Sequence, residues 1–206
     1  RERPEKNVWV LYCPYWGVAL SAVHPLTHPS NAEALAQLES WLAVAPENMG
    51  IYDYNMYYMP SWDAMAEKVR WYASKNIKGI WYCGVPTCFR DLFSTLVAGE
   101  MMRDPNQDFE ALKADYVKAN YGAAAPFAAE YLALVKARLA KGYPRGIHQW
   151  FMPPGYYLDD DCIGRSIALF DKMAAAAAGD AKLLAKIAAE RDLMVQSQTG
   201  SGKTGA

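Results

Sequence analysis

The feature that most constrains the fold is a repeated alternation of strand-like and helix-like segments over residues 1–104. Runs rich in β-branched and aromatic residues occur at Val8–Cys13, Met49–Tyr54 and Ile77–Cys83. Each run is followed by a segment with a helical period in its apolar residues. Strand and helix alternating at this spacing predict parallel neighbouring strands, with the helices packed outside the sheet.

The helix-like segments are predicted at residues 31–45, 61–76 and 88–103. In the second segment, Met65, Val69 and Tyr72 are spaced to share one face, so we expect that face to be buried. The third segment should end at Asp104 and Pro105, because proline cannot continue a helix and restricts the residue before it.

Three strand–helix units do not close a sheet, whereas a (β/α)8 barrel takes about 250 residues. We therefore predict an α/β fold in which residues 1–104 are the last units of a TIM-like (β/α)8 barrel. The pattern of residues 105–192 is helical only and predicts an α-helical region after the barrel. Residues 193–206 are interpreted as a tail.

Charge and hydropathy exclude several classes of partner. The net charge is −1, which supplies no positive field for nucleic acid or for an anionic membrane surface. No apolar run reaches the roughly 20 residues that span a bilayer. The charged opening Arg1–Lys6 is not typical of a signal peptide, and we expect the chain to be an internal segment of a longer protein. The four cysteines lack a zinc-binding spacing, so no metal or cofactor is expected.

Aromatic and polar residues gather where the predicted strands end. In a parallel barrel the carboxyl ends of the strands and the following loops carry function. The candidate substrate-binding residues are Tyr15, Trp16, His24, His28, Tyr52, Asp53, Tyr54, Tyr57, Trp81 and Tyr82. Aromatic rings pack on the C–H face of a pyranose, while polar side chains bind its hydroxyls. This pattern predicts an oligosaccharide or glycan site, with packing in the barrel interior as the alternative for a single ring such as Trp81.

Asp53 is the best candidate for a catalytic carboxylate, since it lies at a predicted strand end. Glycoside hydrolysis normally needs two carboxyl groups about 5 to 10 Å apart. No second one is evident, because Glu47 precedes its strand and Asp63 falls on a helix. We expect the principal acids outside this chain and Asp53 to anchor a sugar. The alternative is a hydrogen-bonded structural role.

Two other groups of residues resemble metal sites. His24 and His28 are four residues apart, but the prolines at positions 25 and 29 make this segment a loop, so sugar contact is the preferred role. The acidic residues 159–161 stand at a predicted helix start, where capping is expected rather than calcium binding.

Several ordered blocks carry a resemblance to a known family. The blocks are Ile51–Asn55, Ile77–Gly84, Leu96–Pro105, Asp115–Leu132 and Tyr157–Ala177. Over residues 8–190 the chain resembles the DUF4838 family of bacterial proteins, which looks like glycoside hydrolases of the hexosaminidase and α-glucuronidase type. The resemblance implies a barrel whose last strands carry sugar-contacting aromatics, followed by a helical extension. It also favours an extracellular or periplasmic location.

The end of the chain resembles a different family. Residues 191–206 are similar to the first motif of DEAD-box RNA helicases, in which Lys203 and Thr204 would bind nucleotide and magnesium. That motif needs a strand before the glycine-rich loop and a helix after it. A nucleotide-binding helicase fragment and a noncatalytic carbohydrate-binding protein are therefore alternatives to a fragment of a glycoside hydrolase.

Overall fold

The structure is a computed structural model of the whole chain, and it contains two compact units. It describes residues 3–14, 24–45, 47–53, 62–82, 99–142 and 159–199. Among these residues, the first unit extends to Phe109 and the second begins at Glu110. Each unit is described by itself.

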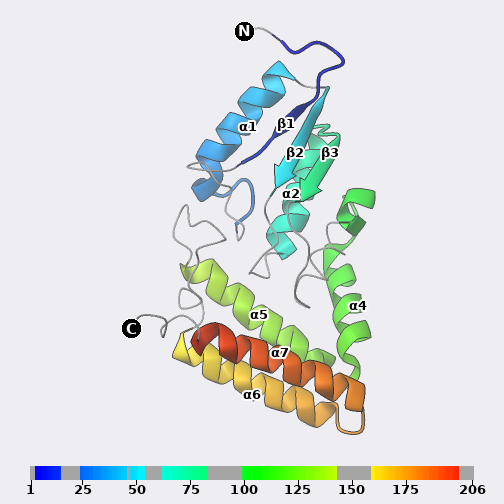
Figure 1. Cartoon of the computed structure of the whole chain (residues 1–206), viewed down its shortest axis with the longest axis vertical. Coiled ribbons are helices and arrows are strands. Elements are labelled where there is room, and N and C mark those ends of the chain that lie inside the picture. Colours follow the sequence, from blue (N-terminus) through cyan, green and yellow to red (C-terminus); the bar gives the residue numbers. More distant parts are fainter. Residues whose placement is uncertain are drawn as a thin grey trace. The chain divides into compact units, whose positions relative to one another are not determined.

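The first unit is built on a three-stranded parallel sheet (Figure 1). Its strands are β1 (Val10–Tyr12), β2 (Met49–Asp53) and β3 (Gly79–Tyr82), in the order β1-β2-β3. Each strand lies within a run that the sequence predicts, so the parallel α/β interpretation is confirmed. Barrel closure is not seen, since the described strands form this one open sheet.

Helices α1 (Ala32–Val44) and α2 (Trp62–Ser74) pack against the same face of the sheet. The buried residues of this core are Tyr12, Leu26, Leu38, Met49, Ile51 and Tyr72. Met49 and Ile51 are two apart in β2 and therefore share a face, and both helices contribute to their cluster. The predicted stripe of α2 is confirmed, because Met65, Val69 and Tyr72 are all buried.

The first unit also contains the end of the third predicted helix. Residues 99–103 are helical and the helix ends before Asp104, as the sequence predicts. Residues 88–98 of that prediction lie outside the described part of the chain. The guanidinium of Arg70 on α2 donates to the carbonyl oxygens of Pro105 and Gln107, at 3.0 Å each. These bonds tie the segment after the helix to α2.

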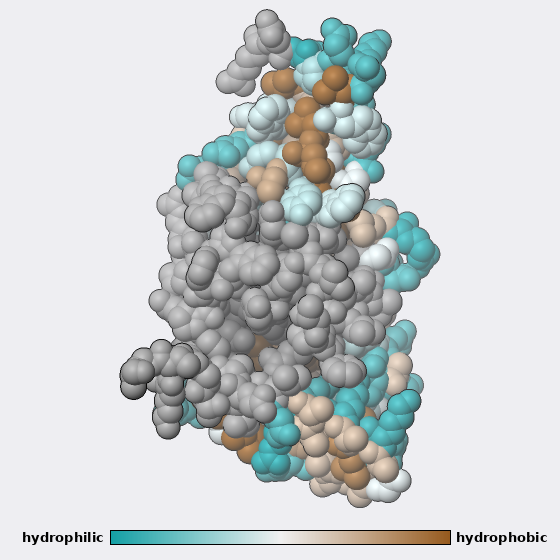
Figure 2. All heavy atoms as spheres, viewed as in Figure 1, coloured by the Kyte–Doolittle hydropathy of each residue, from teal (hydrophilic) through white to brown (hydrophobic). Residues whose placement is uncertain are grey.

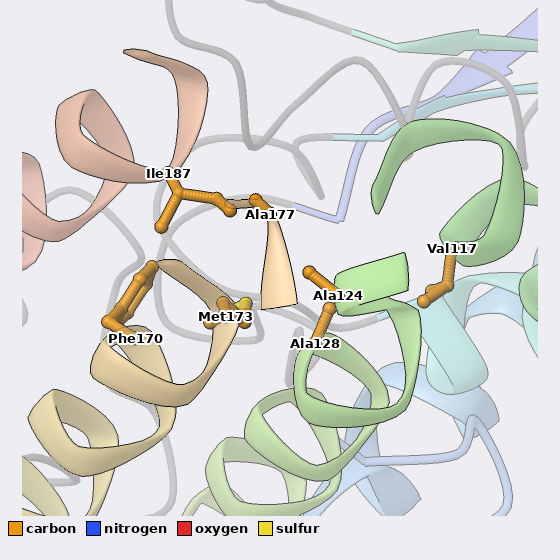
Figure 3. Close-up of a cluster of buried hydrophobic side chains, with 7 residues drawn as sticks. All are labelled: Val117, Ala124, Ala128, Phe170, Met173, Ala177 and Ile187. Carbon is orange, nitrogen blue, oxygen red and sulfur yellow. The ribbon is translucent and has the colours of Figure 1, made fainter. Parts of the chain in front are cut away.

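The second unit is helical. Its elements are α4 (Phe109–Tyr121, whose first residue belongs to the first unit), the 3-10 turn η2 (Gly122–Ala124), α5 (Ala125–Gly142), α6 (Asp160–Ala176) and α7 (Ala181–Thr199). Its main core cluster contains Val117, Ala124, Ala128, Phe170, Met173, Ala177 and Ile187, contributed by all four helices and the turns beside them (Figure 3). The described residues 110–142 and 159–192 thus consist of helices and the turns between them. No helix in the described ranges is long and apolar enough to cross a membrane.

The acidic start of α6 is a helix cap. The carboxylate of Asp159 accepts a hydrogen bond from the backbone N–H of Cys162 at 2.8 Å. It also forms an ion pair with Arg138 on α5 at 2.8 Å, and Arg138 reaches Asp161 as well. Capping, the expected role, is what these contacts provide.

The end of the described chain bears on the helicase-like alternative. Helix α7 continues to Thr199, so residues 193–199 are helical. In the helicase-like interpretation this stretch would be a strand leading into the phosphate loop. Lys203 and Thr204 lie outside the described residues.

Candidate functional site

The candidate site lies at the carboxyl ends of the parallel strands. Asp53 is the last residue of β2, and Tyr52 precedes it. The register pairs Tyr52 with Trp81 and Asp53 with Tyr82 across β2 and β3. The sequence therefore correctly predicts that these residues are neighbours, since the carboxyl ends of parallel strands meet at one edge of a sheet.

The two sides of this edge have different surroundings. Ile51 and Asp53 share the face that the helices cover, because residues two apart in a strand point the same way. Asp53 is only 3% exposed and contacts α2. Tyr52 points to the opposite face, together with Trp81 on β3. The predicted site residues of β2 therefore divide between the two faces of the sheet.

The opposite face carries an aromatic pair. The ring centroids of Tyr52 and Trp81 are 6.3 Å apart and their planes are inclined by 17°. Trp81 is 65% exposed, and Leu11 on β1 is 56% exposed. Figure 2 shows a strip of apolar atoms, flanked by paler residues, where Figure 1 draws the strands. An exposed indole parallel to a second ring offers a flat surface that suits the C–H face of a sugar ring.

The helix-covered face carries a buried polar cluster. The carboxylate of Asp53 lies 3.8 Å from the Nζ atom of Lys68, whose side chain is fully buried. The hydroxyl of Tyr72 donates to the same carboxylate at 3.3 Å. Burial lowers the pKa of Lys68, and the carboxylates of Asp53 and Glu67 oppose this shift. Asp53 is thus hydrogen-bonded and ion-paired within the helix layer.

Sequence reasoning missed Lys68, although a signal was present. Met65, Lys68, Val69 and Tyr72 stand at positions i, i+3, i+4 and i+7, which share one helix face. A lysine in the middle of an apolar stripe is unusual, because lysine is almost never fully buried unless it is paired. The pattern therefore indicated a buried carboxylate partner near α2. The structure identifies that partner as Asp53.

The loop after β1 brings the two histidines together. The rings of His24 and His28 are stacked, with centroids 3.9 Å apart and planes inclined by 13°. Burial lowers the pKa of His24, and the neighbouring His28 lowers it further. The amide of Asn31 donates to the carbonyl oxygen of Pro25 at 2.7 Å, and Leu26 is completely buried. These contacts fix the loop between the histidines.

Glu67 is a second carboxylate at this end of the first unit. Its Oε1 atom accepts a hydrogen bond from the hydroxyl of Thr27 at 3.4 Å, which links the loop after β1 to α2. Its Oε2 atom is the one buried side-chain oxygen in the described part of the chain without a hydrogen-bond partner. Glu67 was not a candidate in the sequence, because it falls on a helix.

Some predicted site residues cannot be placed. Tyr15, Trp16, Tyr54 and Tyr57 lie outside the described residues, and for Tyr82 only the backbone is described. Among the residues that can be searched, no group of three or more His, Cys, Asp or Glu side chains could hold a metal ion. Chemically, the described arrangement offers an aromatic surface on one face and a paired carboxylate on the other.

The comparisons with known proteins give one match. No curated protein and no solved structure matches the chain. The sequence profile of a domain of unknown function, DUF4838, matches residues 1–133, which include the whole first unit up to Phe109 and continue into α5. The resemblance seen in the sequence is confirmed over these residues, and the chain belongs to the DUF4838 family.

Proposed function

We propose that this chain binds an oligosaccharide at the carboxyl ends of its parallel strands, as part of a protein of the glycoside hydrolase type. The observation that carries the proposal is the aromatic pair. Trp81 is 65% exposed and lies nearly parallel to Tyr52 at the strand ends. Sugars pack on such rings through their C–H faces. The near-neutral charge of the chain suits a glycan better than a polyanion.

The arrangement of strands and helices supports a β/α barrel as the setting of this site. The strands follow one another in sequence order, and the helices after β1 and β2 pack on the same face. In a barrel that face is the outer one, and the opposite face points into the barrel. Tyr52 and Trp81 would then stand at the carboxyl-terminal mouth, where enzymes of this fold bind substrate.

The same arrangement supports a partner for the sheet. Parallel sheets occur almost only with both faces covered, whereas Leu11 and Trp81 are largely exposed on one face. We propose that the remaining strands of the barrel, from the same protein or from another chain, pair with β1 and β3. Sedimentation and thermal unfolding of the isolated chain check this proposal. A monomer that unfolds cooperatively would contradict it.

The catalytic acids are proposed to lie elsewhere. Asp53 is the carboxylate at a described strand end, and it is buried against Lys68 and Tyr72. A hydrolase needs a second carboxyl group beside the sugar. A noncatalytic carbohydrate-binding protein is the alternative. Release of an aryl leaving group from aryl glycosides, assayed with the chain alone and with its barrel completed, separates the two functions.

The binding proposal is tested by intrinsic-fluorescence titration with acidic, acetamido and neutral oligosaccharides. The native chain is expected to show saturable quenching by one of these classes. Trp81→Ala and Tyr52→Ala are expected to remove it. Trp41→Ala is the matched control, because Trp41 is also exposed, at 46%, but lies on α1. Equal binding by native protein and Trp81→Ala would refute the proposed site.

A further inference from the structure

We propose that Lys68 is a positioning residue for the aromatic pair. Through the carboxylate of Asp53, it fixes the carboxyl end of β2 and thereby the direction of the Tyr52 ring on the opposite face. The inference rests on the proposed sugar site, whose described surface is formed by Tyr52 and Trp81. It assigns a role to a buried charge that the proposed binding surface does not itself use.

The first step is the contact itself. The Nζ atom of Lys68 lies 3.8 Å from the carboxylate of Asp53, and the Tyr72 hydroxyl donates to the same carboxylate oxygen at 3.3 Å. Both partners come from α2, one helical turn apart. Two contacts from one helix hold the Asp53 side chain, and with it the last residue of β2, against α2.

The second step is the cost of a lysine at this place. Removing an ammonium group from water costs several kcal/mol, and an apolar residue of similar volume often gives equal or greater stability. The neighbours at i−3 and i+1, Met65 and Val69, show that an apolar side chain suits this face. A buried pair of this kind is better explained by a defined geometry than by a gain in stability.

The third step connects Asp53 with Tyr52. The peptide bond between them is planar, so two dihedral angles at each residue determine where the side chains point. Because alternate residues of a strand face opposite ways, holding Asp53 against α2 directs Tyr52 away from α2. There Tyr52 lies nearly parallel to Trp81, with centroids 6.3 Å apart. The ion pair on one face therefore supports the ring pair on the other.

The test compares two substitutions in the buried face of α2. Lys68→Met removes the charge and keeps the length of the side chain. Met65→Ala is the matched control, because it leaves a cavity in the buried face of the same helix and keeps the charges of Lys68 and Asp53. Asp53→Asn/Lys68→Met removes both charges of the pair and provides a second variant, in case Lys68→Met fails to fold.

Two measurements are made on whole chains that far-UV circular dichroism shows to be folded. The first is the affinity for the oligosaccharide that the native protein binds. The second is fluorine NMR of protein labelled with fluorotryptophan, with the Trp81 signal assigned by its loss in Trp81→Phe. We expect both variants that lack Lys68 to bind roughly tenfold more weakly and to shift or broaden the Trp81 signal. Met65→Ala should keep the affinity and the signal.

The outcomes separate the positioning role from the proposed function. Native affinity and an unchanged Trp81 signal in the Lys68 variants overturn the positioning role while the sugar site stands. An equal loss in Met65→Ala overturns it as well, because the effect would then be general destabilisation. If the native protein binds no sugar, the proposed function fails, and the Trp81 signal alone decides whether Lys68 orients the ring pair.

Discussion

Removal of the buried charge of Lys68 is expected to destabilise the first unit strongly. In Lys68→Met the side chain keeps its volume, and the carboxylate of Asp53 stays in a site that is 3% exposed. The Tyr72 hydroxyl still donates to that carboxylate, but the ammonium group that balances its charge is gone. The cost therefore comes from the loss of this charge partner rather than from lost packing.

The distance between the two groups gives the size of the effect. With an effective dielectric constant of about 20, two unit charges 3.8 Å apart attract each other by about 4 kcal/mol. Breaking a buried ion pair on one side generally costs about 3–5 kcal/mol. We therefore expect Lys68→Met to lower the free energy of unfolding by about 3–5 kcal/mol. Asp53→Asn/Lys68→Met should recover about 2 kcal/mol or more of this loss, because a neutral amide then replaces the buried Asp53 carboxylate.

Urea denaturation, followed by circular dichroism, measures the free energy of unfolding for Lys68→Met, for Asp53→Asn and for the double variant. The midpoint should change while the slope stays constant, and the cycle gives the coupling energy of the pair. Arg103→Met is the control, because its ion pair with Glu100 is closer, at 2.7 Å, but exposed to solvent; it should leave stability unchanged. Native stability in Lys68→Met, or single effects that simply add, would refute the reasoning.

Three further predictions follow from the described contacts. His24 should titrate below its ordinary pKa of about 6.5, and His28→Gln should raise the pKa of His24, which NMR titration measures. Between the lowered pKa of His24 in the folded chain and its ordinary pKa in the unfolded chain, the unfolded chain binds more protons. The native fold should therefore lose stability as pH falls through that range. An unchanged His24 titration in His28→Gln would contradict the predicted effect of His28. Gly179 has a positive φ of 95°, so Gly179→Ala should lower the stability measured by thermal unfolding by about 1–2 kcal/mol. Gly164→Ala, on the open surface of α6, should raise stability by about 0.5–1 kcal/mol. A loss of stability in both variants would show that the backbone conformation of Gly179 is not the cause. Tyr121→Phe removes hydrogen bonds of 3.0 and 3.1 Å to a glutamate on α7 and should lower stability by about 1–3 kcal/mol, whereas native stability would show that the hydroxyl contributes nothing.

The sequence predicted the elements of the fold well, because the signals involved are local. Apolar residues with a helical period predicted α2 and its buried stripe, and both are present. Branched and aromatic runs predicted the strands, and their spacing predicted parallel pairing. The helix end before Asp104 and the acidic cap of α6 also follow from a few adjacent residues. Residues 193–199, which resemble the strand of a helicase motif, are helical instead.

The sequence by itself determined that Asp53, Tyr52 and Trp81 meet at one edge of a parallel sheet, because strand order and strand ends follow from the pattern. Only the tertiary structure decided which face each residue occupies and what it touches there. Asp53 meets Lys68 because α2 crosses that face, and no spacing along the chain connects two residues that are brought together by packing. Tyr52 and Trp81 stack because the register places them on the other face. Periodicity is a property of the chain, whereas the partner of a buried charge depends on how separate elements pack.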